Sequence, residues 1–216
     1  LDSLVAAVAA KRSSADVAAL HERFVAALGP EGALELPRQP LDLAAGQRIY
    51  AQRCATCHGD RGLGDGPAAQ QGAVAAPAIG SRDAVADASP ALMYRIVSVG
   101  VAGTPMPAWA GTLSADQRWN VVAYVTHLRA SDEERRTGEG LFVQRCASCH
   151  GATGGSDGAL TRTLSTLPPE VGSFMWQAER SDAQLAAVIR EGLPGRAMPP
   201  NRELTPSELA GMIPHV

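Results

Sequence analysis

The sequence is poor in aromatic residues, which make up 4% of its 216 residues, and it contains only four cysteines. Secreted disulfide scaffolds are small and dense in cysteine, so this chain is not one of them. No apolar run reaches the roughly 18 residues of a membrane span, and charged residues interrupt the opening stretch where a signal peptide would be apolar. We therefore expect no spanning segment, and we expect a chain that begins at Leu1 to be a processed or excised product.

The overall composition narrows the class of protein further. Hydrophobic residues make up 45% of the chain, which is enough to bury a core, and alanine is frequent among them. A core with few aromatic side chains suits a bulky prosthetic group that fills the volume, and an alanine-rich helical protein is the plainer alternative. The formal net charge of −3 argues against nucleic acid as a partner, because binding to a phosphate backbone requires a basic surface.

Two short motifs use all four cysteines. They are Cys54-Ala55-Thr56-Cys57-His58 and Cys146-Ala147-Ser148-Cys149-His150. Two thiols three positions apart, followed directly by a histidine, are the attachment signature of a c-type heme. Each thiol adds to one vinyl group of the porphyrin, and the histidine presents its imidazole to the iron from one face. The sequence therefore predicts two covalently bound hemes c, with His58 and His150 as ligands of the irons.

Two other readings of these motifs stay open at the level of sequence. Zinc normally takes four protein ligands, and each motif offers at most three adjacent ones, so only the pooled motifs would make a four-thiolate site. A redox dithiol stands on a strand–helix turn, whereas the segments around these motifs are helical and glycine-rich with no βαβ pattern.

The two motifs belong to an internal repeat with an offset of 92 residues. Residues 46–54, GQRIYAQRC, align with residues 138–146, GEGLFVQRC, and Gly100 aligns with Gly192. A repeat of this kind predicts two copies of one structural unit, each carrying one motif.

The repeat also selects a second ligand for each iron. Among five methionines, only Met106 and Met198 occupy matching positions, each 48 residues after its motif histidine (106 − 58 and 198 − 150). Both stand next to proline, which rigidifies a loop and lowers the entropy cost of holding one side chain in place. A thioether opposite an imidazole raises the reduction potential of the iron and closes it to outside ligands. We therefore predict Met106 and Met198 as the sixth ligands.

Helical periodicity surrounds the motifs. We expect one helix that leads into Cys54, one over residues 91–99 that ends at Gly100, and one over residues 114–129 that Ser114 caps. Ser131 to Arg136 is expected to be a charged linker.

These elements predict an all-α chain of three parts. Residues 1–42 form an N-terminal helical extension and linker, residues 43–131 a first heme domain, and residues 132–216 a second heme domain. The last helix of the second domain is expected to be truncated at Val216.

Both motifs, both proline-flanked methionines and the phrase Val121-Val-Ala-Tyr124-Val make the chain resemble the class I c-type cytochromes, in a diheme tandem form similar to cytochrome c4. The resemblance covers about residues 43–216. It implies a small helical bundle around each heme, in which the first and last helices cross. Gly46 and Tyr50 match the crossing glycine and aromatic residue of the family, opposed by Val121 and Tyr124.

The same resemblance implies further details of each domain. In the second domain the facing positions of the helix crossing fall on Met212 and His215. In the family, the carbonyl of a residue like Pro67 accepts the N–H of the heme-ligating histidine and fixes its ring, and Ala159 stands at the matching place. The glycine-rich loop Gly59–Gly66 lacks the Lys-Ser/Thr of a phosphate-binding loop and is expected to wrap tightly around the heme edge.

Covalent heme attachment in bacteria takes place outside the cytoplasmic membrane. The resemblance therefore implies a periplasmic protein, or an outward-facing domain of a cytoplasmic-membrane protein. A narrower resemblance is to the cytochrome portion of cytochrome–iron permease fusion proteins, in which a transmembrane permease follows the cytochrome. It rests on the helical segment before the first motif and on the phrases Gly64-Asp-Gly-Pro-Ala-Ala and Gly103-Thr-Pro-Met-Pro.

The function that these resemblances imply is electron transfer between redox-protein donors and acceptors, by a carrier rather than an enzyme. Three alternatives remain. The chain is the redox domain of a membrane iron permease that acts in ferrous iron oxidation and uptake, a diheme oxidoreductase such as a peroxidase or a sulfur-compound dehydrogenase, or a docking module of a larger membrane complex. A peroxidase needs an open iron, so the two matched methionines count against it.

Overall fold

The computed structural model describes Ala6, Ala10, Asp16 and Arg23, followed by residues 34–72 and 75–213. The N-terminal helical extension expected over residues 1–42 therefore lies mostly outside the described residues. The chain divides into two compact units, Leu1–Leu36 and Pro37–Val216, and the second unit holds both cysteine motifs. Every regular element described in this unit is helical, which confirms the expected all-α class.

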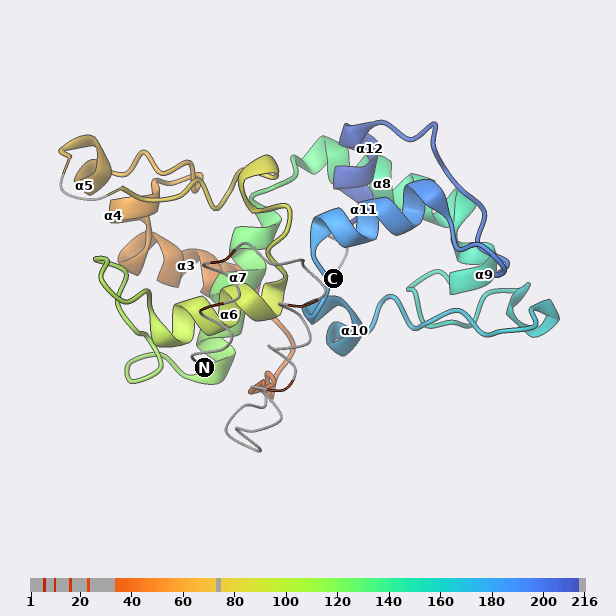
Figure 1. Cartoon of the computed structure of the whole chain (residues 1–216), viewed down its shortest axis with the longest axis horizontal. Coiled ribbons are helices and arrows are strands. Elements are labelled where there is room, and N and C mark those ends of the chain that lie inside the picture. Colours follow the sequence, from red (N-terminus) through yellow and green to blue (C-terminus); the bar gives the residue numbers. More distant parts are fainter. Residues whose placement is uncertain are drawn as a thin grey trace. The chain divides into compact units, whose positions relative to one another are not determined.

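Figure 1 shows the elements of the second unit in chain order. Those of the first repeat are α3 (Leu43–Arg53), α4 (Ala55–His58), α5 (Pro67–Gln70), η2 (Asp83–Val85), α6 (Pro90–Val99) and α7 (Ala115–His127). Those of the second repeat are α8 (Asp132–Arg145), α9 (Ala147–His150), η3 (Thr161–Thr163), α10 (Phe174–Ala178), α11 (Asp182–Glu191) and α12 (Pro206–Met212). No helix among the described residues is long and apolar enough to serve as a membrane span.

Helices α3 and α7 cross at Gly46. A Cβ atom added to Gly46 would lie 2.0 Å from the Asn120 carbonyl oxygen, so only glycine permits this approach of the two backbones. Beside this contact the rings of Tyr50 and Tyr124 pack with their centroids 5.3 Å apart, and Val121 is buried. The crossing predicted for the first domain is thus confirmed.

Helices α8 and α12 cross in the same way in the second repeat. A Cβ atom on Gly138 would lie 2.0 Å from the carbonyl carbon of Gly211, and one on Gly211 would lie 1.8 Å from the Glu134 carbonyl oxygen. The contact therefore uses a glycine on each helix, and Met212 is buried beside it. His215, the other residue expected at this crossing, lies outside the described residues.

The segment Ser131 to Arg136 is not the charged linker expected from its composition. Ser131 is the N-cap of α8, and the charged residues form the first turn of that helix. The Ser131 hydroxyl accepts the Glu134 N–H at 3.2 Å, and the Glu134 carboxylate accepts the Ser131 N–H at 2.8 Å, which together form a capping box. Acidic residues at this end of a helix also suit its dipole, so the prediction of a linker was wrong. The predicted Ser114 cap of α7 and the end of α6 at Gly100 are confirmed.

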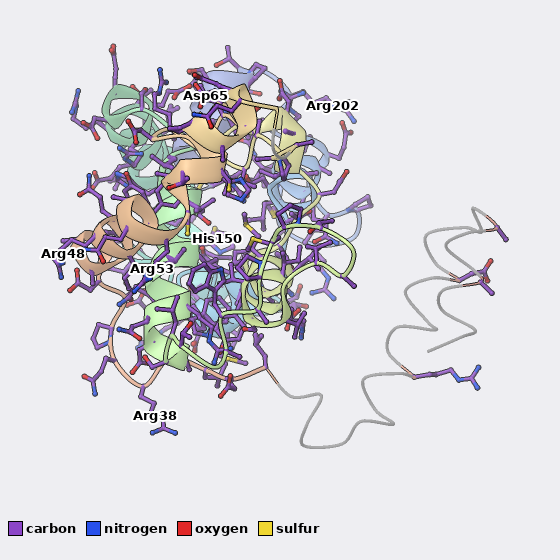
Figure 2. All side chains as sticks on the ribbon, turned by 90° about the vertical axis from the view of Figure 1, so that its left-hand side faces the viewer. Arg38, Arg48, Arg53, Asp65, His150 and Arg202 are labelled. Atoms are coloured by element: carbon purple, nitrogen blue, oxygen red, sulfur yellow. The ribbon has the colours of Figure 1, made fainter. Side chains whose placement is uncertain are left out.

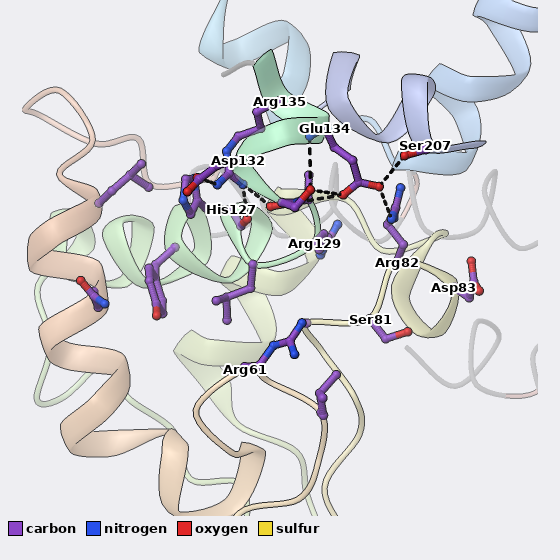
Figure 3. Close-up of a pocket in the computed structure, with 18 of the residues that line it drawn as sticks. Arg61, Ser81, Arg82, Asp83, His127, Arg129, Asp132, Glu134, Arg135 and Ser207 are labelled. Carbon is purple, nitrogen blue, oxygen red and sulfur yellow. Dashed lines mark hydrogen bonds and ion pairs between the residues drawn. The ribbon is translucent and has the colours of Figure 1, made fainter. Parts of the chain in front are cut away.

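Glu134 should make the stability of the fold depend on pH. Its carboxylate accepts hydrogen bonds from the Ser131 backbone and from Ser207 and Arg82, and these lower its pKa from 4.5 to about 2 (Figure 3). Because the folded pKa is depressed, the stabilisation is complete above pH 4.5 and is lost as the pH falls towards 2. We expect Glu134→Gln to lower the free energy of unfolding by about 1–2 kcal/mol at pH 7, since water screens a partly exposed carboxylate.

Urea unfolding of Glu134→Gln and of the unmutated protein from pH 7 to pH 3 measures this effect, and the difference should shrink steadily below pH 4.5. Glu133→Gln is the matched control, because it removes a charge from the same helical turn at an exposed position. A difference that stays constant with pH would show that the Glu134 charge contributes nothing to stability.

Candidate functional site

Helix α3 places the first motif at its C-terminal end. Cys54 caps the helix by donating its N–H to the Tyr50 carbonyl at 2.8 Å, and the single turn of α4 follows. The N–H groups of Cys57 and His58 both donate to the Cys54 carbonyl, at 3.1 and 2.9 Å. Gly59, with φ of 78°, ends the turn. One helical turn therefore carries both thiols and the imidazole, which is the arrangement that attachment of a porphyrin requires.

The second motif forms the same backbone hydrogen bonds as the first. Cys146 donates its N–H to the Phe142 carbonyl at 2.8 Å at the end of α8. Cys149 and His150 donate to the Cys146 carbonyl at 3.1 and 2.9 Å, and Gly151 ends the turn with φ of 83°. The repeat seen in the sequence is thus a repeat of backbone structure.

The cysteines suit thioether attachment better than the other two readings of the motifs. All four are free and half-buried. Burial raises the pKa of Cys54 to about 11, and burial also raises that of Cys146. Thiols in this state are protonated at neutral pH, unlike the reactive thiolate of a redox dithiol. Among the residues that the structure describes, His, Cys, Asp and Glu side chains gather in no group of three or more that could hold a metal ion, so the motifs do not converge on a shared zinc site.

The ring of His58 is oriented by Pro77. Its Nδ1 lies 3.2 Å from the Pro77 carbonyl oxygen, which leaves Nε2 for a ligand. Pro67, expected in this role, instead begins α5, and its carbonyl accepts the Gln71 N–H at 3.1 Å. That prediction was wrong because Pro67 was carried over from the family, whereas the prolines that align within this chain are Pro77 and Pro169.

His150 lies in a matching but less complete environment. Burial lowers its pKa, which favours the neutral imidazole that binds iron, while the carbonyl of Pro169 acts in the opposite direction. It is the carbonyl of Pro169, and not that of Ala159, that acts on the His150 ring, and Pro169 matches Pro77 at the offset of 92. The Nδ1 atom of His150 is buried and has no hydrogen-bond partner within the described part of the chain. The sequence contained the signal for both prolines, because they align in the repeat.

The two methionine loops are also built alike. Each follows a glycine with positive φ, Gly100 at 70° and Gly192 at 65°. The Val101 N–H donates to the Met106 carbonyl at 3.1 Å, and the Leu193 N–H donates to the Met198 carbonyl at the same distance. Both methionine side chains are half-buried.

Further bonds hold each methionine loop against the helix before it. The Trp109 N–H donates to the Val97 carbonyl of α6, and the Asn201 N–H donates to the Ile189 carbonyl of α11, each at 3.1 Å. In the first loop the Thr104 hydroxyl also accepts the Met106 N–H at 3.2 Å. Tertiary structure thus holds both methionines that the repeat singled out in the same loop conformation.

The glycine-rich loops fold back onto the histidines. Gly64 donates its N–H to the His58 carbonyl, and Ser156 donates to the His150 carbonyl, both at 2.8 Å. A Cβ atom on Gly64 would lie 2.3 Å from the Ala76 carbonyl oxygen, so the first loop excludes a side chain there. The second loop accepts Ser156 at φ of 60°, with its hydroxyl bonded to the Pro168 carbonyl at 2.6 Å.

Helix α6 carries an apolar face that protein atoms leave uncovered. Leu92, Ile96 and Val99 follow one another at helical spacing and are 44%, 37% and 73% exposed. Val188 of α11, at the position that matches Ile96, is 38% exposed. Since α6 and α11 lead directly into the methionine loops, these exposed apolar side chains suit a large apolar ring bound beside each loop. The residues present therefore fit a heme in each domain.

Arginines next to the two motifs have different surroundings. Arg145, directly before Cys146, forms an ion pair with Glu203. Arg48 and Arg53 are exposed on α3, and Figure 2 shows Arg48 at the edge of the molecule. The first motif thus lies beside exposed positive charge, whereas the arginine at the second motif is neutralised.

Fold, repeat and site together define a class of protein, a diheme c-type cytochrome of the class I type. The family model for cytochrome c oxidase, cbb3-type, subunit III matches the chain twice, over residues 41–125 and 133–216. The chain belongs to this family. It therefore binds two hemes c covalently.

Curated relatives are subunits of such oxidases. FixP of Sinorhizobium medicae (strain WSM419) is 29% identical over 125 residues, which are 53% of this chain and 40% of FixP. CcoP of Rubrivivax gelatinosus is 26% identical over 147 residues, 67% of this chain and 44% of CcoP, so the chain spans less than half the length of both relatives. The solved Kuenenia stuttgartiensis reducing HAO-like protein complex Kustc0457/Kustc0458 is similar with a TM-score of 0.35 and 20% identity, over 84% of this chain and 96% of that one.

Proposed function

We propose that this chain is the heme-bearing part of a cbb3-type oxidase subunit and passes electrons from a redox-protein donor towards the oxidase in the membrane. The observation that supports this most directly is the double match of the family model to two halves with the same backbone geometry. The relatives named above are oxidase subunits, which favours an oxidase over an iron permease as the membrane partner.

We assign the ligands of each heme from the two repeated sites. Cys54 and Cys57 would hold the first heme, and His58 and Met106 would bind its iron. The second set is Cys146, Cys149, His150 and Met198. The bound heme supplies a one-electron ferric/ferrous couple.

The protein's own groups set the properties of that couple. The Pro77 carbonyl holds the His58 ring in one orientation through the bond at Nδ1. The bonds across each methionine loop hold the methionine in place, and its thioether would bind the iron and favour the ferrous state. Irons bound by both histidine and methionine would suit an electron carrier and would argue against a diheme peroxidase.

Heme retention tests this proposal. We expect the purified protein to keep two hemes per chain after acid–acetone extraction, because thioether bonds survive unfolding. The double variant Cys54→Ala/Cys57→Ala should keep one heme, and so should Cys146→Ala/Cys149→Ala. Pyridine hemochrome spectra with protein quantification give the stoichiometry.

Thr56→Ala is the control within the first motif, since it leaves the thiols and the histidine in place and should keep both hemes. A colourless protein, or heme that extraction removes, would disprove the assignment of the cysteines. Reoxidation of the reduced chain by membranes with and without a cbb3-type oxidase tests the partner separately.

A further inference from the structure

We propose that the ion pair between Arg129 and Asp182 clamps the two heme domains in one relative geometry, and that it is a positioning pair for electron transfer between the hemes. This inference rests on the proposed binding of one heme in each domain. It concerns the contact between the domains, which neither the family match nor the relatives' names describe.

Arg129 is buried and Asp182 is partly buried. Arg129 follows helix α7, and its side chain is only 1% exposed. Its Nη1 donates to Oδ2 of Asp182 at 2.9 Å, and the Asp182 side chain is 18% exposed. Nη2 of Arg129 lies 2.7 Å from Sδ of buried Met93, so the guanidinium is held from two sides. A charge at this depth is stable only with its partner, and the pair therefore opposes separation of the surfaces that carry it.

Neighbouring contacts join the same two domains. The N–H of Ala183, next to Asp182, donates to the Ala86 carbonyl of the first domain at 2.9 Å. Trp119 of α7 meets Phe174 of α10 edge to face, with ring centroids 4.8 Å apart. Helices α10 and α11 are thus fastened to the first domain at several points, and the buried ion pair is the most specific of them.

A second group of polar contacts joins the domains at another place. Arg82 of the first domain donates to Glu134 of α8 at 3.0 Å and to the Pro206 carbonyl of α12 at 3.4 Å. Figure 3 shows this group in a cavity that Arg129 also lines. Arg82 is more exposed than Arg129, so we expect it to contribute less to holding the domains together.

The repeat indicates that Asp182 is not needed by its own helix. Helices α6 and α11 both begin after a serine N-cap, Ser89 and Ser181, whose side chains accept a backbone N–H. The next residue is Pro90 in the first repeat and Asp182 in the second. An acid at this position suits the helix dipole, but the serine cap already begins the helix without it. The carboxylate is the feature that reaches across to Arg129.

Fixed domains matter because the rate of electron tunnelling falls exponentially with the distance between the hemes. Helix α7 ends at His127 and α8 begins at Asp132, so only a short connection links the domains along the chain. Without the clamp, rotation about this connection would spread the distance over a range of values. With the clamp, one distance and one heme–heme orientation persist.

The test uses the full diheme protein and two single variants, Arg129→Met and Asp182→Asn. Three signals are measured: the electron equilibration between hemes after pulsed reduction, the heme–heme exciton couplet in Soret circular dichroism, and the far-red sulfur–iron absorption. We expect both variants to lose the single fast equilibration phase and the couplet, while the far-red absorption stays at the strength of two hemes.

Arg202→Met is the matched control. It removes an arginine from an ion pair of 2.6 Å with Glu191, but both side chains are exposed, at 71% and 62%, and both lie in the second domain. This variant should keep all three signals. The double variant Arg129→Met/Asp182→Leu replaces the buried pair with an apolar contact and should restore the couplet, because such replacements hold buried surfaces together.

The inference is overturned if Arg129→Met and Asp182→Asn keep both the couplet and the fast phase, or if they lose the far-red absorption, which would make the pair part of a heme site. If Arg129→Met does not fold, Asp182→Asn and the double variant decide the question. Failure of the proposed function itself is separate, because it would appear in the unmutated protein as missing heme or missing far-red absorption.

Discussion

Met106→Ala and Met198→Ala should each remove about half of the far-red sulfur–iron absorption of the ferric protein, because each leaves one thioether ligand in place. The same variants should lower the reduction potential of one heme by on the order of 0.1 V or more, within the roughly 0.8 V that axial ligands span. The bonded loops that hold both methionines are alike, so we expect similar losses at the two sites. Optical spectroscopy of the ferric state and spectroelectrochemistry provide the two measurements.

Met175→Ala is the control for these variants. Met175 is 51% exposed on α10 and has no methionine at its matching position in the repeat. It should change neither the absorption nor the potentials. If Met106→Ala or Met198→Ala leaves the far-red absorption unchanged, another group coordinates that iron, and the carrier interpretation of that domain fails.

Gly138→Ala should destabilise the second heme domain severely. The added methyl group would lie 2.0 Å from the carbonyl carbon of Gly211, and backbone cannot move aside as a flexible side chain can. Overpacking of this kind costs roughly 2–3 kcal/mol, more than the gain of about 0.5–1 kcal/mol expected from replacing glycine within a helix. Thermal unfolding followed by circular dichroism should show a clear drop in the midpoint.

Gly140→Ala is a stringent control because it makes the same change two residues later in α8. A Cβ atom on Gly140 meets no atom within 4 Å, so this variant should be slightly more stable than the unmutated protein, by about 0.5–1 kcal/mol. Opposite signs for the two alanines would confirm the close crossing of α8 and α12. Equal effects would mean that these helices do not approach as closely as the structure places them.

Features that depend on a few adjacent residues could be predicted from the sequence. The turns at the two cysteine motifs, the Ser114 cap and the helix end at Gly100 all form through bonds between neighbours along the chain. The internal repeat also allowed a prediction about residues far apart in the chain, because it aligns Met106 with Met198 without any knowledge of the fold. Whether these methionines bind iron is a prediction that awaits the spectra.

Two predictions failed although the sequence contained the correct signal. Pro77 and Pro169 align at the offset of the repeat, yet Pro67 was expected to orient the histidine. The pattern Ser131-x-x-Glu134 is a capping box, yet its charge was interpreted as a linker. For the prolines the internal repeat was a better guide than family resemblance, and for the helix start the capping pattern was a better guide than composition.

The sequence by itself determined the two heme-attachment turns, their repetition and the helices that carry them, because these follow from spacing and from hydrogen bonds within a few residues. Only the tertiary structure decided which surfaces meet: Gly138 against Gly211, and Arg129 against Asp182, 53 positions further along the chain. Hydrophobic periodicity shows which face of a helix is buried, but it does not identify the helix or loop that packs against that face. That choice depends on shape and charge brought together from distant parts of the chain.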